Sequence, residues 1–193
     1  AEGRDFTIAR VLYEDTGAGG RRAFGWMGTD ISHPGVDATV NSIDAHYFSA
    51  DNRWVVDGQV MHSDVQGITG TGGFADVSFR PQRGVQHTLR STYIDDTLDI
   101  NDLGFLTRND QVNMDYSYSR TESDVLGLRE RSTRISFTNQ WNTQGQPVRV
   151  GLFFNRSYTS LDNNKFDYSF RYLPERIDDR LGSATLLLIP IYR

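Results

Sequence analysis

The sequence predicts an all-β fold, an antiparallel meander of about 10–12 long strands. Apolar and polar residues alternate with period two along most of the chain, which is the repeat of half-buried strands and not the 100° repeat of a helix. Turn signals rich in Gly, Asp and Asn separate these runs. Most of the links are shorter than the dozen or so residues that a crossover between parallel strands needs, so neighbouring strands are expected to be antiparallel.

The alternation predicts about eleven strands in chain order. In the stretch KFDYSFRY, for example, Phe166, Tyr168 and Phe170 alternate with Asp167 and Ser169. The predicted ranges are 6–14, 22–31, 39–49, 53–64, 73–80, 85–95, 105–120, 129–141, 147–159, 165–173 and 184–192. The turns between them are DTGAGG, SHPGVD, SADN, VQGITGTG, PQRG, TESDVLG, NTQGQ, LDNN and PERIDDRLG, in which Gly supplies positive φ and Asp and Asn tolerate it.

Composition and charge narrow the classes of function. The 193 residues suffice for one domain, so residues 1–193 are expected to form a single β-barrel domain, part of a larger barrel. The formal net charge of −5, with no basic cluster, argues against a nucleic-acid partner. The chain has no Cys, which excludes disulfides and thiolate metal sites.

No apolar run reaches the roughly 18–20 residues of a membrane-spanning helix. The N-terminus AEGRDFTIARV lacks a signal-peptide core, which predicts a chain that is cytoplasmic, already processed or cut from something larger.

Strand length and side-chain chemistry favour a membrane barrel over a soluble sheet. Several runs reach ten residues or more, against about 5–6 in a usual strand. Lys occurs once, at Lys165, and the polar face is instead Ser, Thr, Asn, Gln, Asp and Arg. The apolar face is rich in aromatics, with Trp54 and Trp141 near strand ends. This pattern is typical of outer-membrane barrels, whose strands turn apolar residues to lipid and polar residues to the lumen.

One stretch, DINDLGFLTRND at residues 99–110, resembles the recurring motif D-x-N-D-L-G-F-L-x-R-N-D of a family of bacterial outer-membrane barrels. The stretches RDFTIARV, FGWMGTDIS and NSIDAHYFSADNRWVVDGQV resemble early barrel strands of the same family. Its members carry an N-terminal module similar to a carbohydrate-binding domain, followed by a C-terminal barrel of unknown function. That module is absent here, the family's barrel is longer, and the chain ends at Arg193 where such barrels commonly end in an aromatic residue.

The resemblance covers most of the chain and implies a part of the C-terminal barrel. It implies residence in the bacterial outer membrane, with the lipid bilayer as a partner. It also implies transport or binding of glycans or other small solutes at the cell envelope. Neither the resemblance nor the residues indicate an oligomeric state.

The same motif supplies the candidate site residues, which are expected to form a structural or binding joint. Gly104 permits a bend, and Asp102 and Asn109 hold loop backbone. The full set is Asp99, Asn101, Asp102, Gly104, Arg108, Asn109 and Asp110. The acidic loop from Asp95 to Asp102 is a weaker candidate for Ca²⁺, because its spacing departs from an EF-hand and a solvated loop is favoured. No other cofactor and no other metal site is expected.

No catalytic residue is predicted. The four histidines, His33, His46, His62 and His87, fall on different predicted elements and show no metal-binding spacing. GITGTGG, at residues 67–73, has neither a following Lys nor a helix, so it is expected to be a mobile hairpin loop rather than a phosphate loop. Two alternatives to the membrane barrel stay open. One is a soluble lectin-like β-sandwich that stacks exposed Tyr and Trp on sugars, and the other is a barrel-embedded hydrolase.

Alternation of hairpins predicts which segments share a rim. Short turns near 51, 82 and 163 are expected on one rim, and the 96–104 loop on the other, together with SHPGVD and VQGITGTG. Phe105 is expected to open the next strand, in which Arg108 and Asp110 share a face with Leu106 and Val112. Further along this strand, Val112, Met114, Tyr116 and Tyr118 are expected to face lipid and Ser117 the lumen.

Overall fold

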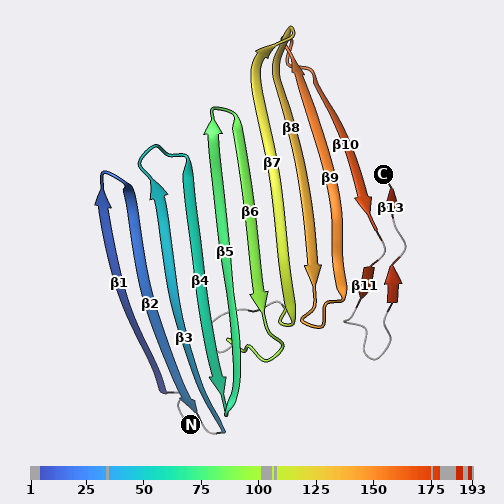
Figure 1. Cartoon of the computed structure of the whole chain (residues 1–193). Coiled ribbons are helices and arrows are strands. Elements are labelled where there is room, and N and C mark those ends of the chain that lie inside the picture. The colour runs from blue at the N-terminus through green and yellow to red at the C-terminus, as the bar shows by residue number, and fades with distance from the viewer. Residues whose placement is uncertain are drawn as a thin grey trace. The chain divides into compact units, whose positions relative to one another are not determined.

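The computed structural model describes residues 5–33, 35–100, 106, 108–174, 176–178, 186–188 and 191–192. The elements of this part are β-strands joined in a meander (Figure 1). The strands are Asp5–Gly17 (β1), Gly20–His33 (β2), Val36–Ser49 (β3), Trp54–Val65 (β4), Ile68–Gln82 (β5), Val85–Ile94 (β6), Gln111–Val125 (β7), Leu128–Trp141 (β8), Pro147–Ser160 (β9), Lys165–Leu173 (β10), Arg176–Asp178 (β11), Leu186–Leu188 (β12) and Ile191–Tyr192 (β13).

Hydrogen-bonded neighbours follow chain order from β1 to β10, with β13 beside β10, while β11 pairs with β12. The predicted all-β antiparallel meander is therefore confirmed. The described residues contain no helix long and apolar enough to cross a membrane. The chain divides into two compact units: unit 1 comprises residues 1–77 and 91–112, and unit 2 comprises residues 78–90 and 113–193. β5, β6 and the first residues of β7 contribute to both units.

The register of unit 1 defines two faces of β1–β4. Val11 pairs with Trp26, Trp26 with Ile43 and Ile43 with Val60, so these four residues form one row across the strands. The neighbouring row holds Leu12, Gly25, Asp44 and Gln59 on the opposite face, because successive side chains of a strand alternate. We call the first face the apolar face of unit 1 and the second its charged face.

Local turn chemistry sets this register. Gln66 and Gly67, which join β4 to β5, have φ of 54° and 80°, the positive values that a two-residue type I′ hairpin turn needs. Between β3 and β4, the Ser49 hydroxyl accepts the backbone N–H of Arg53 at 3.1 Å and of Trp54 at 2.8 Å. Turn residues therefore supply the hydrogen bonds that the reversing backbone loses.

Unit 2 has the same two-faced construction. Ile135 of β8 pairs with Phe154 of β9, which pairs with Phe170 of β10. The adjoining row, Arg134, Asn155 and Ser169, lies on the opposite face. We call these the aromatic face and the polar face of unit 2. Register shifts interrupt the β8–β9 pairing between Leu128 and Glu130 and between Gln140 and Trp141.

Both boundaries of the seventh predicted strand are wrong. The strand predicted over 105–120 is β7 and begins at Gln111, so Leu106, Arg108 and Asp110 do not belong to it. Asp110 has φ of 53° and its N–H donates to Asp95 O at 3.0 Å, which ends the loop just before the strand. β7 instead continues to Val125, and the turn TESDVLG shrinks to two residues. Of the strand predicted over 184–192, the structure describes the short strands β12 and β13.

The glycine-rich stretch GITGTGG is also not a mobile loop, because Ile68–Gly73 opens β5. Its glycines make room for a segment that crosses the strand. A Cβ on Gly70 would lie 2.3 Å from Leu98 Cα and N, and one on Gly72 would lie 2.7 Å from Leu98 Cδ2. Leu98 is only 1% exposed here, and the Asp99 N–H donates to the Ser63 hydroxyl at 3.1 Å. Residues 97–99 therefore pack onto the charged-face side of β4 and β5.

For the turns of unit 1, the predicted grouping at one end of the strands is confirmed, but the predicted loop lengths are wrong. In unit 1, alternation of hairpins puts the turns near 34–35 and 66–67 at the same end as the segment after β6. SHPGVD and VQGITGTG are nevertheless tight turns, since only two residues separate β2 from β3 and β4 from β5. The connection between Ile94 and Gln111, at the same end, is long.

Candidate functional site

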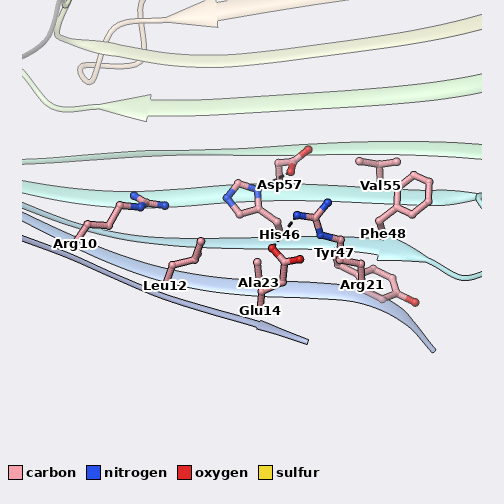
Figure 2. A pocket seen from close by; sticks show the side chains of 10 residues that line it. All are labelled: Arg10, Leu12, Glu14, Arg21, Ala23, His46, Tyr47, Phe48, Val55 and Asp57. Atoms are coloured by element: carbon pink, nitrogen blue, oxygen red, sulfur yellow. Dashed lines mark hydrogen bonds and ion pairs between the residues drawn. The ribbon is translucent and has the colours of Figure 1, made fainter. Parts of the chain in front are cut away.

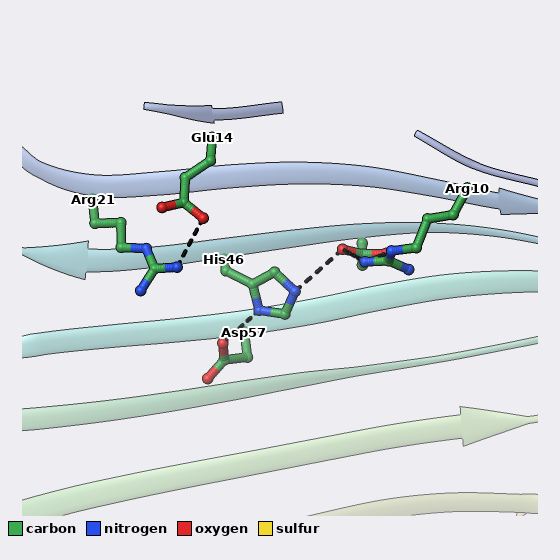
Figure 3. Close-up of polar contacts among 6 residues, drawn as sticks. Arg10, Glu14, Arg21, His46 and Asp57 are labelled. Atoms are coloured by element: carbon green, nitrogen blue, oxygen red, sulfur yellow. Dashed lines mark hydrogen bonds and ion pairs between the residues drawn. The ribbon is translucent and has the colours of Figure 1, made fainter. Parts of the chain in front are cut away.

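Charged side chains from four strands meet on the charged face of unit 1. One cross-strand row contains Glu14, Ala23, His46 and Asp57, and the next contains Asp44. Residues directly opposite each other have Cβ atoms about 4.5–5.5 Å apart, so the register alone brings these side chains within contact. Figure 3 shows the resulting chain of polar contacts.

Asp44 lies at the centre of this cluster. Its side chain is 7% exposed and lies 3.2 Å from the Arg10 Nη2 and 3.2 Å from the His46 Nε2. A buried carboxylate needs such partners, because burial without them costs several kcal/mol. The facing residue must be small: a Cβ on Gly25 would lie 2.5 Å from Asp44 Oδ2. Gly25 thus provides the space in which the carboxylate meets its partners.

His46 links the two acidic residues of the cluster. Its Nδ1 lies 2.7 Å from Asp57 Oδ1, and its Nε2 faces Asp44 (Figure 3). An ionised carboxylate only accepts hydrogen bonds, so both contacts form when both ring nitrogens carry a proton. The hydrogen bond to Asp57, with a smaller one to Asp44, therefore favours the protonated ring and raises the pKa of His46.

A cavity of about 520 Å³ opens over the cluster. Its charged lining includes a second ion pair, in which Arg21 Nη2 donates to Glu14 Oε2 at 2.8 Å. Its apolar lining comes from Leu12, Phe48 and Val55, so charged and apolar groups share one wall (Figure 2). Volumes of about 300–1,000 Å³ are usual for small-ligand sites.

The chemistry of the lining suits the binding of a polar solute. The described lining residues are Arg10, Leu12, Glu14, Arg21, Ala23, His46, Tyr47, Phe48, Val55 and Asp57. None of these is a Ser, Thr or Cys that His46 could activate as a nucleophile. The guanidinium and carboxylate groups can instead hold the hydroxyl or charged groups of a polar solute. The apolar side chains can contact its carbon skeleton.

This cluster was missed by sequence reasoning, which treated the histidines as scattered. Asp44 and His46 stand two apart in NSIDAHYFS, which puts them on one face of a strand. Asp57 comes from the next strand of the hairpin. The D-x-H spacing was therefore a usable signal. The β3–β4 register, which places Asp57 opposite His46, could not be predicted from the sequence.

The predicted site motif lies elsewhere, after β6. Asn101, Asp102 and Gly104 fall outside the described residues. Asn109 donates through Nδ2 to Asp96 O at 2.7 Å, and Arg108 O accepts from Gln111 Nε2 at 3.1 Å. These contacts fasten the loop to itself. Asp99 and Asp110 bond through their backbone N–H groups to Ser63 and Asp95, as described above.

In the predicted Ca²⁺ loop, the first carboxylate, that of Asp95, already accepts hydrogen bonds from backbone N–H groups. Asp95 Oδ1 accepts the N–H groups of Thr97 at 3.1 Å and Leu98 at 2.6 Å, and Oδ2 accepts that of Thr71 at 2.5 Å. In the part of the chain that the structure describes, no three His, Asp or Glu residues come together as metal ligands. Because Asn101 and Asp102 lie outside that part, the calcium site stays a prediction.

The fold and the site define a β-meander protein that carries a charged, ligand-sized cavity on one face of its sheet. The chain belongs to the family of a domain of unknown function, DUF5916, which matches residues 28–180. Asp44, His46 and Asp57 lie inside the matched region, and Arg10, Glu14 and Arg21 precede it. Comparison with curated proteins and with solved structures finds no match.

Proposed function

We propose that the chain forms part of the wall of a bacterial outer-membrane β-barrel that binds or transports glycans or other small polar solutes. One observation carries the proposal: among the described residues, most large aromatic and many aliphatic side chains are exposed or half-buried, while the few buried side chains include seven polar or charged ones. In water this arrangement would leave the main driving force of folding unused. In a bilayer it is the expected one, because lipid solvates the apolar side chains.

The apolar face of unit 1 supports this orientation. Its central row consists of Val11, Trp26, Ile43 and Val60, which are 64%, 40%, 64% and 63% exposed. The next row adds Tyr13 and Phe24, and all these residues come from four consecutive strands. Soluble monomers rarely expose contiguous apolar patches of this kind except at interaction sites.

The identity of the buried residues also supports the membrane orientation. The buried hydrophobic residues of the described part are Ala23, Ile31, Ala38, Ile94 and Leu98. The buried polar ones are Thr29, Ser42, Asp44, Ser49, Ser63, Thr138 and Asn142. A soluble domain is expected to bury Leu, Ile, Val and Phe first. A buried set that is so small, and in which hydroxyls and a carboxylate outnumber Leu and Ile, is typical of a barrel with a polar interior.

The charged cavity supports the solute-binding half of the proposal. It lies on the face opposite the exposed apolar row, which in a membrane barrel is the lumen side. Arg10, Arg21 and Glu14 would offer hydrogen bonds to a passing solute; Asp44 holds Arg10, and Arg21 and Glu14 hold each other. A glycan suits this wall because its hydroxyls and ring carbons match the mixed polar and apolar lining.

The experiment is fractionation of cells that make the full-length protein, followed by gel migration of the purified protein with and without heating. The expected result is recovery in the outer-membrane fraction and a band that shifts on heating, as for a folded barrel. Recovery as a detergent-free monomer in the soluble fraction would contradict the proposal and favour the lectin-like alternative. Protease protection of the full-length protein in vesicles provides the independent check.

A further inference from the structure

The polar face of unit 2 carries three arginines that have no partner among the described residues. Arg134, Arg149 and Arg171 come from β8, β9 and β10, and all three are exposed. The registers put them on the same face: Arg134 pairs with Asn155, Arg171 with Phe153 and Arg149 with Gln140. Among the described residues none of the three has an ion pair or a side-chain hydrogen bond.

The acidic residues on this face do not neutralise them. Asp167 lies 3.3 Å from the Lys165 Nζ. Asp115 accepts from the Thr138 hydroxyl and from Asn113 Nδ2, the latter at 2.8 Å. Glu130 lies farther along β8, opposite Thr159. This differs from the charged face of unit 1, where Arg10 and Arg21 each contact a carboxylate.

The arginines are spaced for an extended ligand. Arg134 and Arg171 are separated by two strands and by one step of two residues in register. With about 4.8 Å between strands and 3.3 Å per residue, their Cα atoms are roughly 12 Å apart. Arg149 lies four residues along β9 from Phe153, or roughly 13 Å. One small anion cannot reach all three guanidinium groups, whereas an oligomer with repeated acidic groups can.

An aromatic ring lies between the arginines. Phe153 is directly opposite Ser136 on one side and Arg171 on the other. The neighbouring Gly151 keeps space for it, since a Cβ there would lie 2.8 Å from Phe153 Cε2 and 2.9 Å from Leu173 Cδ2. Ser132, Ser136, Asn155, Ser157 and Ser169 surround it with hydrogen-bonding groups. The face thus combines cations, an apolar ring and hydroxyl or amide groups.

We propose that the polar face of unit 2 binds acidic oligosaccharides, with Arg134, Arg149 and Arg171 pairing with successive carboxylates and Phe153 contacting a sugar ring. Guanidinium groups form strong, bidentate hydrogen bonds with carboxylates, and such pairs discriminate sharply against neutral analogues. The inference rests on the proposed function, because it names the class of glycan that the barrel handles.

The test is equilibrium binding of trigalacturonate to the full-length protein in detergent, with its neutral methyl ester as the matched probe. The acid is expected to bind, the ester to bind at least tenfold more weakly, and affinity to fall as salt is raised. Arg134→Gln and Arg171→Gln should each weaken binding of the acid roughly tenfold, as expected for a charge-assisted hydrogen bond. Arg53→Gln, which removes the same charge from the turn between β3 and β4, should leave affinity unchanged.

Equal binding of acid and ester, no binding of either, or unchanged affinity in both face variants would overturn this inference. Heat-dependent gel migration of each variant shows whether it is folded. The salt titration and the comparison with the methyl ester use only the natural protein, so they do not depend on the folding of a variant. A protein that inserts in the membrane but does not distinguish the two probes refutes the acidic ligand and leaves the barrel standing. A soluble protein that binds only the acid refutes the barrel instead.

Discussion

Replacing Ile135 by Arg tests the membrane orientation directly. Ile135 is 39% exposed on the aromatic face of unit 2, in one row with Phe154 and Phe170. On the same face, Arg131 lies four residues toward one end of β8 and Asn139 four residues toward the other. At about 3.3 Å per residue, each is roughly 13 Å away. Ile135 therefore lies midway along a span of about 26 Å, close to the 25 Å or so of outer-membrane barrels, although Arg156 also lies on this face, two residues from Phe154.

The expected cost follows from this central position. An Arg that faces lipid at the bilayer midplane destabilises a barrel by about 2–4 kcal/mol. The same substitution on an exposed face in water should change the free energy of unfolding by no more than about 0.5 kcal/mol. Ser136→Arg is the matched control, because Ser136 is the next residue and points to the polar face. It should stay within about 0.5 kcal/mol in either environment.

The assay is reversible folding of the full-length protein into phosphatidylcholine vesicles, titrated with urea and followed by Trp fluorescence and heat-dependent gel migration. A difference of about 2 kcal/mol or more between Ile135→Arg and Ser136→Arg is expected. If both variants unfold at the same urea concentration as the natural protein, the aromatic face does not contact lipid. If Ser136→Arg costs more, the two faces are assigned the wrong way round.

Three further predictions concern local contacts. Gly70→Ala should destabilise the protein by about 1–3 kcal/mol and speed proteolysis after β6, because the added Cβ would lie 2.3 Å from the Leu98 backbone. Gly58→Ala is the control and should be tolerated, because its Cβ would have its nearest contact at 3.4 Å. A double-mutant cycle of Arg10→Met and Asp44→Asn should give a coupling energy of about 1 kcal/mol or more in urea unfolding, and additivity would show that the ion pair contributes nothing. Hydrogen bonds from the Ser49 hydroxyl and the Arg53 backbone N–H lower the pKa of Asp51 in the folded protein. The ionised Asp51 carboxylate therefore stabilises the fold fully above its unfolded pKa of about 3.9, and this stabilisation is lost as pH falls through the folded pKa. Asp51→Asn should therefore reduce the loss of stability on acidification below pH 4 or so, and an unchanged acid-unfolding curve would contradict this.

The sequence by itself determined the number and order of the ten long strands and which residues of each strand share a face. Alternation is local: each residue's side of a strand follows from its neighbours, as in KFDYSFRY, which forms β10. Turn residues are local as well, so the hairpins near 51 and 163 fall where Asp and Asn predict them. The antiparallel meander then follows, because links this short leave consecutive strands no other way to pair.

Only the tertiary structure decided the start of β7, the role of the glycines in β5 and the composition of the charged cluster. Asp110 leaves the strand conformation because its N–H bonds to Asp95, and Gly70 is needed because Leu98 crosses it 28 residues later in the chain. His46 meets Asp57 through the β3–β4 register, and a shift of one residue would have put another side chain there. These contacts join residues far apart in sequence, so no local pattern specifies them.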